Sequence, residues 1–345
     1  MKAIVVHAAQ DVRIGSCEVR DPGDDEIQIQ TLRGGICGSD LHYVQHGGFG
    51  SIKLREPMIL GHEISGRVIK SGKNAQSHFA GQLVSVSPSR PCSTCGYCLQ
   101  GNPNHCMNMR FYGSAMPFPH IQGAFREILT VHKDQCADAE GLSPAEATMA
   151  EPLAVTIHAA NQAGSLVGKR VLITGCGPIG LLCALVAQRA GAKEVVTTDI
   201  SDYPLEVAKQ LGVDTTVNVR NSNNHESLNH YYADKGYFDT LFECTGVSSA
   251  LAQAIPALRP RGVIVQLGLG GDMNLPVQAI TAKELELRGS FRFHEEFFTG
   301  VSWMKSRKID VKPLITHTLA LDQMKEAFAL ATDRNTALKV QLAFD

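Results

Sequence analysis

A glycine-rich turn between two apolar segments constrains the fold of this chain more than any other feature. Residues 169–180 read KRVLITGCGPIG and carry Gly175, Gly177 and Gly180 in G-x-G-x-x-G spacing. A β-type run precedes the turn, an apolar helical pattern follows it, and Asp199 stands 19 residues beyond Gly180 at the end of the next β-type run. In this context the pattern predicts a Rossmann unit, in which the turn binds the pyrophosphate of a dinucleotide. The alternative is a purely structural turn, because the glycine spacing alone is a weak signal.

The chemistry of the turn favours NAD as the coenzyme. Glycines let the backbone approach a pyrophosphate, and the N-terminus of the following helix supplies N–H donors and the positive end of a dipole. Asp199 would accept hydrogen bonds from the ribose hydroxyls and repel a 2′-phosphate, so NADP is the less favoured coenzyme. A helix-capping role for Asp199 is the alternative. The predicted cofactor-binding residues are Gly175, Gly177, Pro178, Ile179, Gly180, Asp199 and Leu267.

Strand and helix patterns alternate after residue 150, whereas the first 150 residues are rich in short strands and loops. In the first part, the expected strands are residues 3–6, 27–32, 64–70, 83–86 and 124–131. In the second part, the expected strands are 169–175, 194–199, 238–243, 262–268 and 287–293, and the expected helices are 178–190, 203–211 and 248–258. We expect a helix near 321–331, a final strand at 337–342, and a solvated loop at 221–230. Strands that alternate with helices predict an α/β fold with a doubly wound parallel sheet.

Composition excludes several classes of protein. The chain has 345 residues, of which 44% are hydrophobic and 19% charged, so it is neither disordered nor too short for two domains. The net charge of -2 provides no basic field, so we expect no nucleic-acid partner. Residues 171–188 lack charge over 18 positions, but Gly175, Gly177, Pro178 and Gly180 lie within them, which favours a strand, turn and helix over a membrane span. No secretory pattern opens the sequence, and we expect a cytoplasmic protein.

Four cysteines are crowded into fifteen residues. Cys92, Cys95, Cys98 and Cys106 follow the spacing C-x2-C-x2-C-x7-C. Four thiolates complete a tetrahedral shell around one zinc ion and leave no position open, so this site is predicted to be structural. An iron–sulfur cluster or disulfides are the alternatives, although the spacing differs from ferredoxin patterns and nothing indicates secretion.

A second group of residues is suitable for an open metal site. Cys37 lies in GGICGSDLHY, His62 and Glu63 lie in LGHE, and Glu151 lies in AEPLAV. One cysteine, one histidine and one carboxylate make a three-ligand zinc shell that leaves a fourth position for water or substrate. Zinc in such a shell acts as a Lewis acid on an alcohol. Each of these residues alone is more often part of the core than a ligand.

The motifs CGSDLHY, GHE, AEPLAV and TGCGPIG, together with the four cysteines, resemble those of the zinc-dependent medium-chain dehydrogenases. They span residues 33–200, and the later strand pattern continues the match to the end. The resemblance implies a GroES-like, β-rich catalytic domain over residues 1–150, a Rossmann domain over 151–290, and a segment, 291–345, that returns to the catalytic domain. It also implies two zinc ions per chain and assembly as a homodimer or homotetramer.

The resemblance also implies roles for individual residues. Cys37 and His62 match catalytic zinc ligands, and Glu63 and Glu151 are both candidates for the carboxylate of the shell. Ser39 matches the hydroxyl that passes the alcohol proton outward, and His42 is a candidate for the next relay position or an ordinary surface histidine.

Two arginines are candidates to bind a substrate carboxylate. Arg292, in GSFRF, resembles the substrate-side arginine of polyol enzymes, and Arg110 follows the four cysteines in MRFYG. A guanidinium can bind a carboxylate through two hydrogen bonds, although either arginine could instead form an internal ion pair.

Longer segments favour the sugar-acid side of the polyol branch. RGGICGSDLHY, SPSRPCSTCGYC, MRFYGSAMPFPH and RGSFRFHEEF are similar to segments of the L-idonate 5-dehydrogenases, which interconvert L-idonate and 5-keto-D-gluconate. Sorbitol (L-iditol) and L-threonine dehydrogenases share most of these motifs and are the enzymatic alternatives. A nucleotide-sensing protein without activity is the alternative of another class; the presence of Cys37, His62, Glu63 and Glu151 argues against it. The implied substrate is a small sugar acid or polyol.

Overall fold

The computed structural model describes residues 1–220 and 227–345 and divides the chain into two compact units. Unit 1 comprises Met1–Ala154, His294–Asp333 and Lys339–Asp345, and unit 2 comprises Val155–Phe293 and Arg334–Leu338. The boundaries expected from the sequence were 150/151 and 290/291. The C-terminal segment does not belong to unit 1 throughout. Its residues Arg334–Leu338 pack with unit 2, and the chain then enters unit 1 again at Lys339.

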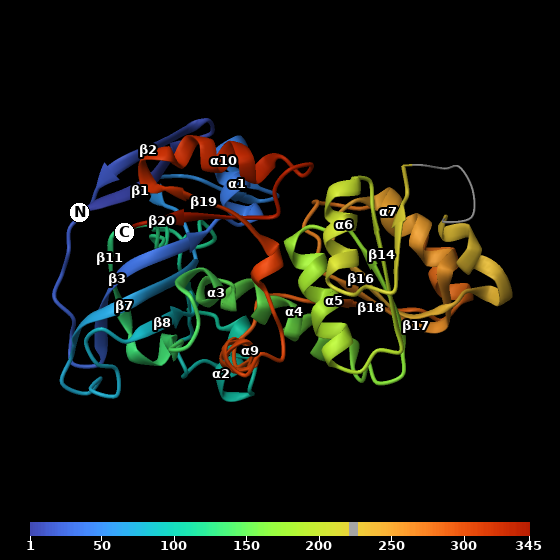
Figure 1. The fold of residues 1–345 in the computed structure, drawn as a ribbon, viewed down its shortest axis with the longest axis horizontal. Helices are drawn as coiled ribbons and strands as arrows, with labels where there is room; N and C mark the ends of the chain where they lie inside the picture. Colours follow the sequence, from blue (N-terminus) through green and yellow to red (C-terminus); the bar gives the residue numbers. More distant parts are fainter. Residues whose placement is uncertain (221–226) are drawn as a thin grey trace. The chain divides into compact units, whose positions relative to one another are not determined.

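Unit 1 is built on a seven-stranded sheet in the order β12-β8-β7-β3-β20-β19, with β11 paired to β3. Its strands are β3 (Glu26–Gly35), β7 (Glu63–Ser71), β8 (Leu83–Val86), β11 (Ile128–His132), β12 (Cys136–Asp138), β19 (Ile315–Ala320) and β20 (Lys339–Ala343). β20 pairs with the end of β3, which brings the last residues of the chain beside residues near position 35 (Figure 1). The buried side chains of Ile27, Ile29, Ile64 and Val84 contribute to the core of this unit.

Shorter elements complete unit 1. The remaining strands are β1 (Lys2–Ala8), β2 (Asp11–Ser16) and β6 (Met58–Ile59) in one sheet, β4 (Gly48–Phe49) with β5 (Ile52–Lys53), and β9 (Ser89–Arg90) with β10 (Arg110–Phe111). The α-helices are α1 (Gly38–His46), α2 (Gly96–Leu99), α3 (Pro144–Thr148), α4 (Ala150–Ala163, which continues into unit 2), α9 (Glu296–Lys305) and α10 (Met324–Thr332). Single 3-10 turns are η1 (Pro103–His105), η2 (Lys133–Gln135), η5 (Lys312–Leu314) and η6 (Leu321–Gln323).

Unit 2 contains the parallel sheet that the sequence predicted. Its strand order is β15-β14-β13-β16-β17-β18, and every pairing is parallel. The strands are β13 (Arg170–Thr174), β14 (Glu194–Asp199), β15 (Thr215–Asn218), β16 (Phe238–Glu243), β17 (Leu258–Gln266) and β18 (Glu286–Gly289). The order reverses between β13 and β16, which is the position where doubly wound sheets bind ligands at the carboxyl ends of their strands.

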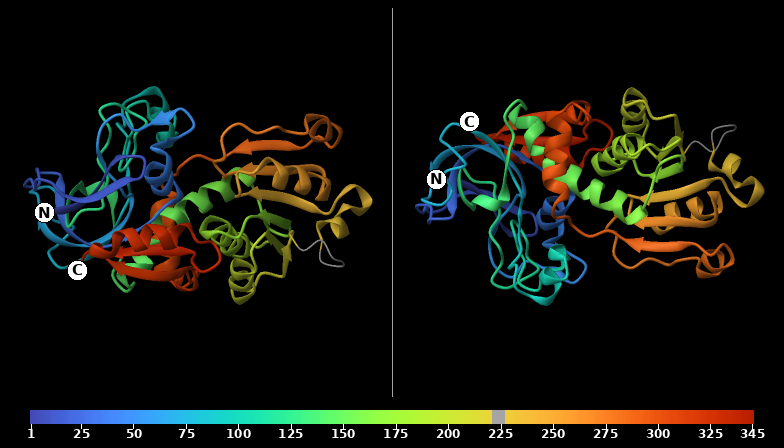
Figure 2. Two further views of the ribbon diagram at one scale, coloured as in Figure 1. Left: turned by 90° about the horizontal axis from the view of Figure 1, so that it is seen from above. Right: turned by 90° about the horizontal axis from the view of Figure 1, so that it is seen from below.

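The helices of unit 2 lie on both faces of its sheet, as in other doubly wound folds. The helices are α5 (Pro178–Arg189), α6 (Asp202–Gln210), α7 (Ser248–Ala254) and α8 (Val277–Ala282), with 3-10 segments η3 (Leu228–Lys235) and η4 (Ile255–Ala257). Figure 1 shows α5 and α6 on one side of the strands and α7 on the other. In both views of Figure 2 the gold and orange strands β17 and β18 run side by side, in agreement with their pairing. Leu172, Val196, Leu241 and Ile264 form part of the apolar core of the sheet.

Several element boundaries differ from the expected ones. The helix expected over 248–258 ends at Ala254, because Pro256 lacks a backbone N–H and the chain continues as a 3-10 turn. The strand expected over 287–293 ends at Gly289, and residues 290–293 lie outside it. The strand expected over 124–131 begins at Ile128, although Ala124 and Phe125 bond to Gly61 and Leu60 through their backbones.

The uncharged segment 171–188 forms a strand and a short helix, not a membrane span. The uncharged residues 171–188 form β13, a turn and the twelve-residue α5. In the part of the chain that the structure describes, no helix is long and apolar enough to cross a membrane. Of the loop expected at 221–230, residues 221–226 lie outside the described residues, and Leu228 begins η3.

Candidate metal centres and dinucleotide loop

A cysteine, a histidine and a glutamate converge in unit 1. Cys37 occupies the N-cap position of α1, Glu63 is the first residue of β7, and His62 precedes it. Their potential ligand atoms, one per residue, all lie within 4.8 Å of one another. His62 and Glu63 are buried, and Cys37 is partly buried. The predicted members Cys37, His62 and Glu63 are therefore brought together, although 25 residues separate the cysteine from the histidine.

A buried aspartate fixes the backbone around this cluster. The Asp40 carboxylate accepts hydrogen bonds from the backbone N–H of Cys37, at 3.0 Å, and of Gly61, at 3.1 Å. One of its oxygens lies 3.8 Å from Nδ1 of His62, which is too long for a hydrogen bond. Nδ1 of His62 is buried and has no hydrogen-bond partner among the described residues. The ring of His62 also interacts with the side chain of Cys37, while its Nδ1 faces Asp40. A metal-binding histidine typically turns its second ring nitrogen toward a carboxylate in this way.

The charges of the cluster shift its pKa values strongly. Burial disfavours the charged imidazolium, but the neighbouring Asp40 and Cys37 outweigh that effect and raise the pKa of His62 well above its ordinary value. Burial raises the pKa of Asp40. Burial also raises the pKa of Glu151 to about 7, and the negative charge of Glu63 acts in the same direction. Lys339 balances part of the negative charge of this buried site, and a divalent cation bound there would supply more positive charge.

The two candidate carboxylates have different partners. Both oxygens of Glu63 accept hydrogen bonds from Nζ of Lys339, at 2.6 and 2.8 Å, and this ion pair is almost completely buried. Gly35 leaves space for the Glu63 carboxylate, because a Cβ at Gly35 would lie 2.0 Å from Oε2. Glu151, in the first turn of α4, is buried and interacts electrostatically with His62 and Glu63, but it is not part of the tight group of three.

The two predicted relay residues share one face of α1. Ser39 and His42 are three positions apart, so their side chains project from the same side of the helix. Both are partly exposed, and the His42 ring lies 5.8 Å from that of Phe49 and 6.1 Å from that of His46.

The four clustered cysteines surround one point in unit 1. Their sulfurs lie within 4.8 Å of one another, and Sγ of Cys95 is 3.6 Å from that of Cys98 and 4.0 Å from that of Cys106. These cysteines are free thiols. A tetrahedral shell with zinc–sulfur bonds of about 2.3 Å places sulfurs roughly 3.8 Å apart, so the geometry fits a mononuclear zinc ion.

Hydrogen bonds to the sulfurs favour thiolates in this lobe. Backbone N–H groups of Cys92 and Asn108 donate to Sγ of Cys106, at 3.2 and 3.3 Å. The side chain of Asn108 donates to Cys92 and lowers the pKa of that thiol to about 5. Burial raises the pKa of Cys98 to about 12, and its contacts with the sulfurs of Cys95 and Cys106 act in the same direction. A bound cation would favour the thiolate of Cys98 as well.

Each glycine of the predicted dinucleotide loop has a distinct physical role. Gly175 has φ +87°, a conformation that L side chains rarely adopt. A Cβ at Gly180 would lie 1.8 Å from the Gly175 carbonyl oxygen, so this glycine permits α5 to approach β13. A Cβ at Gly177 would meet no atom within 4 Å and would project into open space. Pro178 and Ile179 begin α5 directly after this open position, as a pyrophosphate site requires.

Asp199 binds the same loop. Its carboxylate accepts a hydrogen bond from the backbone N–H of Cys176 at 2.7 Å and from those of Ile200 and Ser201, at 2.7 and 3.0 Å. Asp199 thus links the end of β14 to the glycine turn. Leu267 follows β17 at the carboxyl edge of the sheet, where its N–H donates to the Glu243 carbonyl at 2.9 Å.

The two candidate substrate arginines lie in different units. Arg292 belongs to unit 2, has φ +57°, and places its guanidinium 4.8 Å from the ring centre of Phe291. Arg110, in unit 1, is exposed and adjacent to Phe111, whose ring packs 5.6 Å from that of His62. Because successive side chains of a strand point to opposite faces, Arg110 points away from the Cys37–His62–Glu63 cluster. The binding of a substrate carboxylate by Arg110 therefore stays a prediction.

Sequence reasoning did not single out three polar residues of these sites. Asp40 and Lys339 support the cluster of Cys37, His62 and Glu63, and Glu243 is a buried carboxylate at the end of β16. Glu243 accepts hydrogen bonds from the backbone N–H groups of Thr245 and Gly246 and from the side chain of Gln266. The sequence does contain a signal for Glu243, because an acidic residue stands at the end of the strand predicted over 238–243. It contains no comparable signal for Lys339.

Comparisons with known proteins agree with this geometry. The model of the alcohol dehydrogenase GroES-like domain matches residues 23–141, and that of the zinc-binding dehydrogenase family matches residues 178–306. The chain is 45% identical to L-idonate 5-dehydrogenase (NAD(P)(+)) of Escherichia coli strain K12 over 318 residues, covering 92% of this chain and 91% of the relative. It is 35% identical to sorbitol dehydrogenase of Gallus gallus over 346 residues, covering 99% of this chain and 96% of the relative.

A solved structure extends the similarity to the whole fold. The crystal structure of L-idonate 5-dehydrogenase from Escherichia coli K-12 superposes with a TM-score of 0.94 at 42% identity, covering 99% of this chain and 97% of that one. The expected α/β fold, with a GroES-like domain and a parallel-sheet domain, is confirmed, as is the expected dehydrogenase class. The chain belongs to the zinc-dependent medium-chain dehydrogenases.

Proposed function

We propose that the chain is an NAD-dependent L-idonate 5-dehydrogenase that interconverts L-idonate and 5-keto-D-gluconate. The chemistry is carried by one observation: Cys37, His62 and Glu63 bring a thiol, an imidazole and a carboxylate within 4.8 Å in a buried site. The choice of substrate is supported by the 45% identical relative named for that reaction. Sorbitol dehydrogenation is the second candidate, because the 35% identical relative bears that name.

Cys37 and His62 are two of the ligands that would hold the catalytic zinc, with Glu63 or Glu151 as the third. Zinc held there supplies Lewis acidity, which makes an alcohol easier to deprotonate. Asp40 orients the backbone of Cys37 and Gly61, and Lys339 balances the charge of Glu63. Ser39 accepts the alcohol proton and His42 passes it toward solvent, since both lie on one face of α1.

The four cysteines Cys92, Cys95, Cys98 and Cys106 would hold a second, structural zinc. All four positions of a tetrahedral shell are then filled by protein sulfur, so this ion takes no part in the reaction. Its role is to order a lobe that has little apolar core of its own.

Gly175, Gly177 and Gly180 would hold the coenzyme pyrophosphate at the start of α5. The nicotinamide coenzyme accepts or supplies the hydride. Asp199 favours NAD over NADP, because a carboxylate at the end of β14 repels a 2′-phosphate. Pro178, Ile179 and Leu267 complete the proposed coenzyme contacts.

Arg292 is the proposed partner of the substrate carboxylate. Its guanidinium is suited to two parallel hydrogen bonds with a carboxylate. Sorbitol carries no such group, so loss of this arginine should affect the sugar acid far more than the polyol. We further propose that the protein acts in the cytoplasm as a homodimer or homotetramer, as the family resemblance implies.

An absorbance assay of nicotinamide reduction tests the function. Zinc-loaded protein receives NADH or NADPH with 5-keto-D-gluconate, and NAD with L-idonate, sorbitol or L-threonine. We expect turnover with the keto acid and L-idonate, a preference for NADH over NADPH, and little turnover of sorbitol. Turnover of sorbitol or threonine alone would contradict L-idonate as the substrate. A preference for NADPH would contradict the proposal that Asp199 selects NAD. Loss of activity in Cys37→Ser with unchanged melting temperature would support the zinc assignment.

A further inference from the structure

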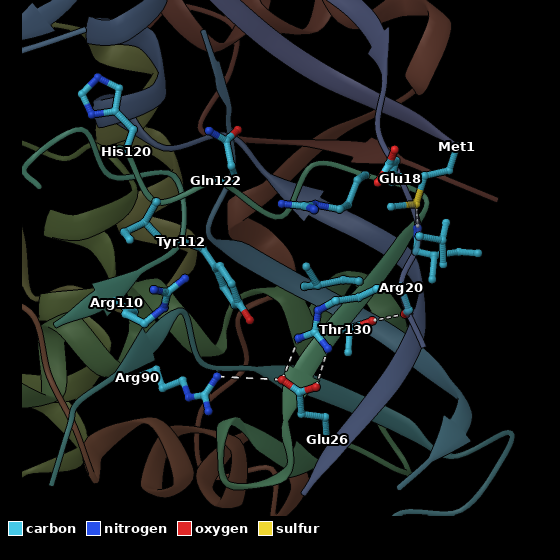
Figure 3. Close-up of a pocket in the computed structure, with 15 residues that line it drawn as sticks. Met1, Glu18, Arg20, Glu26, Arg90, Arg110, Tyr112, His120, Gln122 and Thr130 are labelled. Atoms are coloured by element: carbon cyan, nitrogen blue, oxygen red, sulfur yellow. Dashed lines mark hydrogen bonds and ion pairs between the residues drawn. The ribbon is translucent and has the colours of Figure 1, made fainter. Parts of the chain in front are cut away.

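A cavity of about 360 Å³ opens in unit 1, apart from both groups of candidate metal ligands. Its lining comes from the N-terminus, the chain after β2, the first residue of β3, and the paired strands β9 and β10. The rest of the lining comes from the chain between β10 and β11 and from β11 itself. Figure 3 shows Arg90, Arg110 and Tyr112 together on one side of it, with Met1 and Glu18 at the other end. Cys37, His62, Glu63 and Glu151 are absent from its lining.

The cavity concentrates positive charge in a chain whose net charge is -2. Four arginines line it, namely Arg20, Arg90, Arg110 and Arg126, against two glutamates, Glu18 and Glu26. Glu26 is already engaged, because both of its oxygens accept hydrogen bonds from Arg20, at 2.5 and 2.7 Å. Glu18 is exposed and lies beside Met1, away from Arg90 and Arg110 (Figure 3). Arg90 shares Glu26 with Arg20 through a longer contact of 3.9 Å, and Arg110 and Arg126 have no ion pair with a carboxylate among the described residues.

Two of these arginines oppose each other directly. Arg90 of β9 and Arg110 of β10 are register partners in an antiparallel pair. Like charges in directly opposed positions destabilise a two-stranded sheet. The closest carboxylate contact of Arg90 is Glu26 at 3.9 Å, and the described part of the chain offers Arg110 no ion pair. This arrangement is stabilised when an anion lies between the two side chains.

Arg126 adds a third cationic group to the lining. Burial lowers the pKa of this arginine, and its Nε and Nη2 donate to the Gly123 carbonyl oxygen, at 3.0 and 2.6 Å. Two other polar residues of the lining bond to the backbone: Nε2 of His120 accepts from Arg55 N–H, and Oε1 of Gln122 accepts from Ile59 N–H. The arginines are the charged donors of the lining, and the Tyr112 hydroxyl is a further donor beside Arg90 and Arg110.

We propose that Arg90, Arg110 and Arg126 form a binding site for a small oxyanion, either free phosphate or the carboxylate of a sugar acid. The site lies on the face of β10 opposite to Phe111, whose ring packs on His62. It is therefore a second anion site, distinct from the catalytic centre, and it holds whether or not the chain acts on L-idonate. Occupancy neutralises the opposed arginines and stabilises β9 and β10.

Isothermal titration of the zinc-loaded, coenzyme-free protein with inorganic phosphate and, separately, with D-gluconate tests the proposal. Sodium chloride keeps the ionic strength constant and shows the response to a monatomic anion. We expect the affinity for the binding anion to fall about tenfold in Arg110→Gln and in Arg90→Gln, because each change removes a charge-assisted hydrogen bond. Binding of phosphate alone identifies a phosphate site, and binding of gluconate that survives Cys37→Ser identifies a carboxylate site.

Two matched variants sharpen the result. Arg13→Gln removes an exposed arginine that pairs with Asp11 outside the cavity, and it should leave anion affinity unchanged. Glu26→Gln removes a competing carboxylate from the cavity, and it should tighten anion binding. Circular dichroism in phosphate-free buffer checks that each variant is folded. The proposal is overturned if neither anion binds more tightly than chloride, or if Arg13→Gln weakens binding as much as Arg110→Gln and Arg90→Gln do.

Discussion

Lys339 and Glu63 form an ion pair that is among the most deeply buried charged contacts in the described chain. Their side chains are only 4% and 1% exposed, and Nζ of Lys339 also donates to the Ile36 carbonyl at 3.2 Å. Removing two charges from water is costly, and the cost is offset only while both partners are present. Lys339 therefore holds Glu63 in place beside Cys37 and His62.

Replacement of Lys339 by methionine should destabilise the protein by about 3–5 kcal/mol, because it leaves a buried carboxylate without its counter-charge. Urea unfolding of chelator-treated protein measures this change without a contribution from zinc. The double variant Glu63→Gln with Lys339→Met should recover part of the loss, since neither charge then remains. A loss below about 1 kcal/mol in Lys339→Met would show that the pair contributes no more than a surface ion pair.

Glu26 provides a prediction about pH. Hydrogen bonds from Arg20 lower the pKa of Glu26 from 4.5 to about 2. A lowered folded-state pKa stabilises the protein above pH 4.5, and this stability is lost as the pH falls toward 2. Wild type should exceed Glu26→Gln by about 1–2 kcal/mol at pH 7, a discounted value because Arg20 is largely exposed.

Chemical denaturation of both proteins at pH 7 and at pH 3 checks this sign. The difference in unfolding free energy should shrink at pH 3, because the Glu26 carboxyl group is then largely protonated in the unfolded chain but still mostly ionised in the folded one. Glu18→Gln is the matched control, and its difference from wild type should not change in the same way with pH. If wild type and Glu26→Gln differ in unfolding free energy by the same amount at both pH values, the ion pair of Glu26 with Arg20 is not the cause of the difference.

At the scale of elements, the glycine loop was predictable because every signal is local. A β-type run, three spaced glycines and an apolar helix lie within about twenty residues, and the structure forms β13, the turn and α5 from them. The hydrogen bond from Cys176 N–H to Asp199 was not predictable, because it depends on how β14 is placed beside β13. Pro256 is also a local signal, and it indicates that α7 ends before it. The helical pattern of the surrounding residues nevertheless favoured a longer helix, over 248–258.

Gly177→Ala and Gly180→Ala should separate coenzyme binding from packing. A methyl group at Gly177 meets no protein atom, so the variant should retain its melting temperature but bind NADH at least tenfold more weakly. A methyl group at Gly180 lies 1.8 Å from the Gly175 carbonyl oxygen, so that variant should be destabilised by roughly 1–3 kcal/mol. Melting curves and NADH fluorescence titrations measure the two effects. Equal loss of stability in both variants would contradict the distinct roles.

At the scale of the whole molecule, the sequence predicted the classes of element better than their long-range partners. The alternation after residue 150 indicated a parallel sheet, and the structure has one with the order β15-β14-β13-β16-β17-β18. Nothing local showed that β20 would pair with β3 or that Lys339 would meet Glu63 across 276 residues. Those contacts arise from tertiary packing, which no window of sequence contains. The cysteine cluster was predictable because its four ligands are local.

The two units should respond to different ligands when the whole chain is followed by hydrogen–deuterium exchange. Removal of zinc by a chelator should speed exchange in residues 92–108, because the N–H groups of Cys92 and Asn108 then lose thiolate acceptors held by the metal. Addition of NADH should slow exchange at residues 175–181, where the loop and the first turn of α5 would bind the pyrophosphate.

Cys106→Ser is the internal control for this experiment. Its lobe should exchange quickly with or without chelator, while NADH protection at residues 175–181 persists, because the four sulfurs belong to unit 1 and the loop to unit 2. Slow exchange of residues 92–108 in chelated wild-type protein would show that the lobe is ordered by its own hydrogen bonds and not by a metal. Protection by NADH elsewhere but not at the glycine loop would move the coenzyme site away from the switch between β13 and β16.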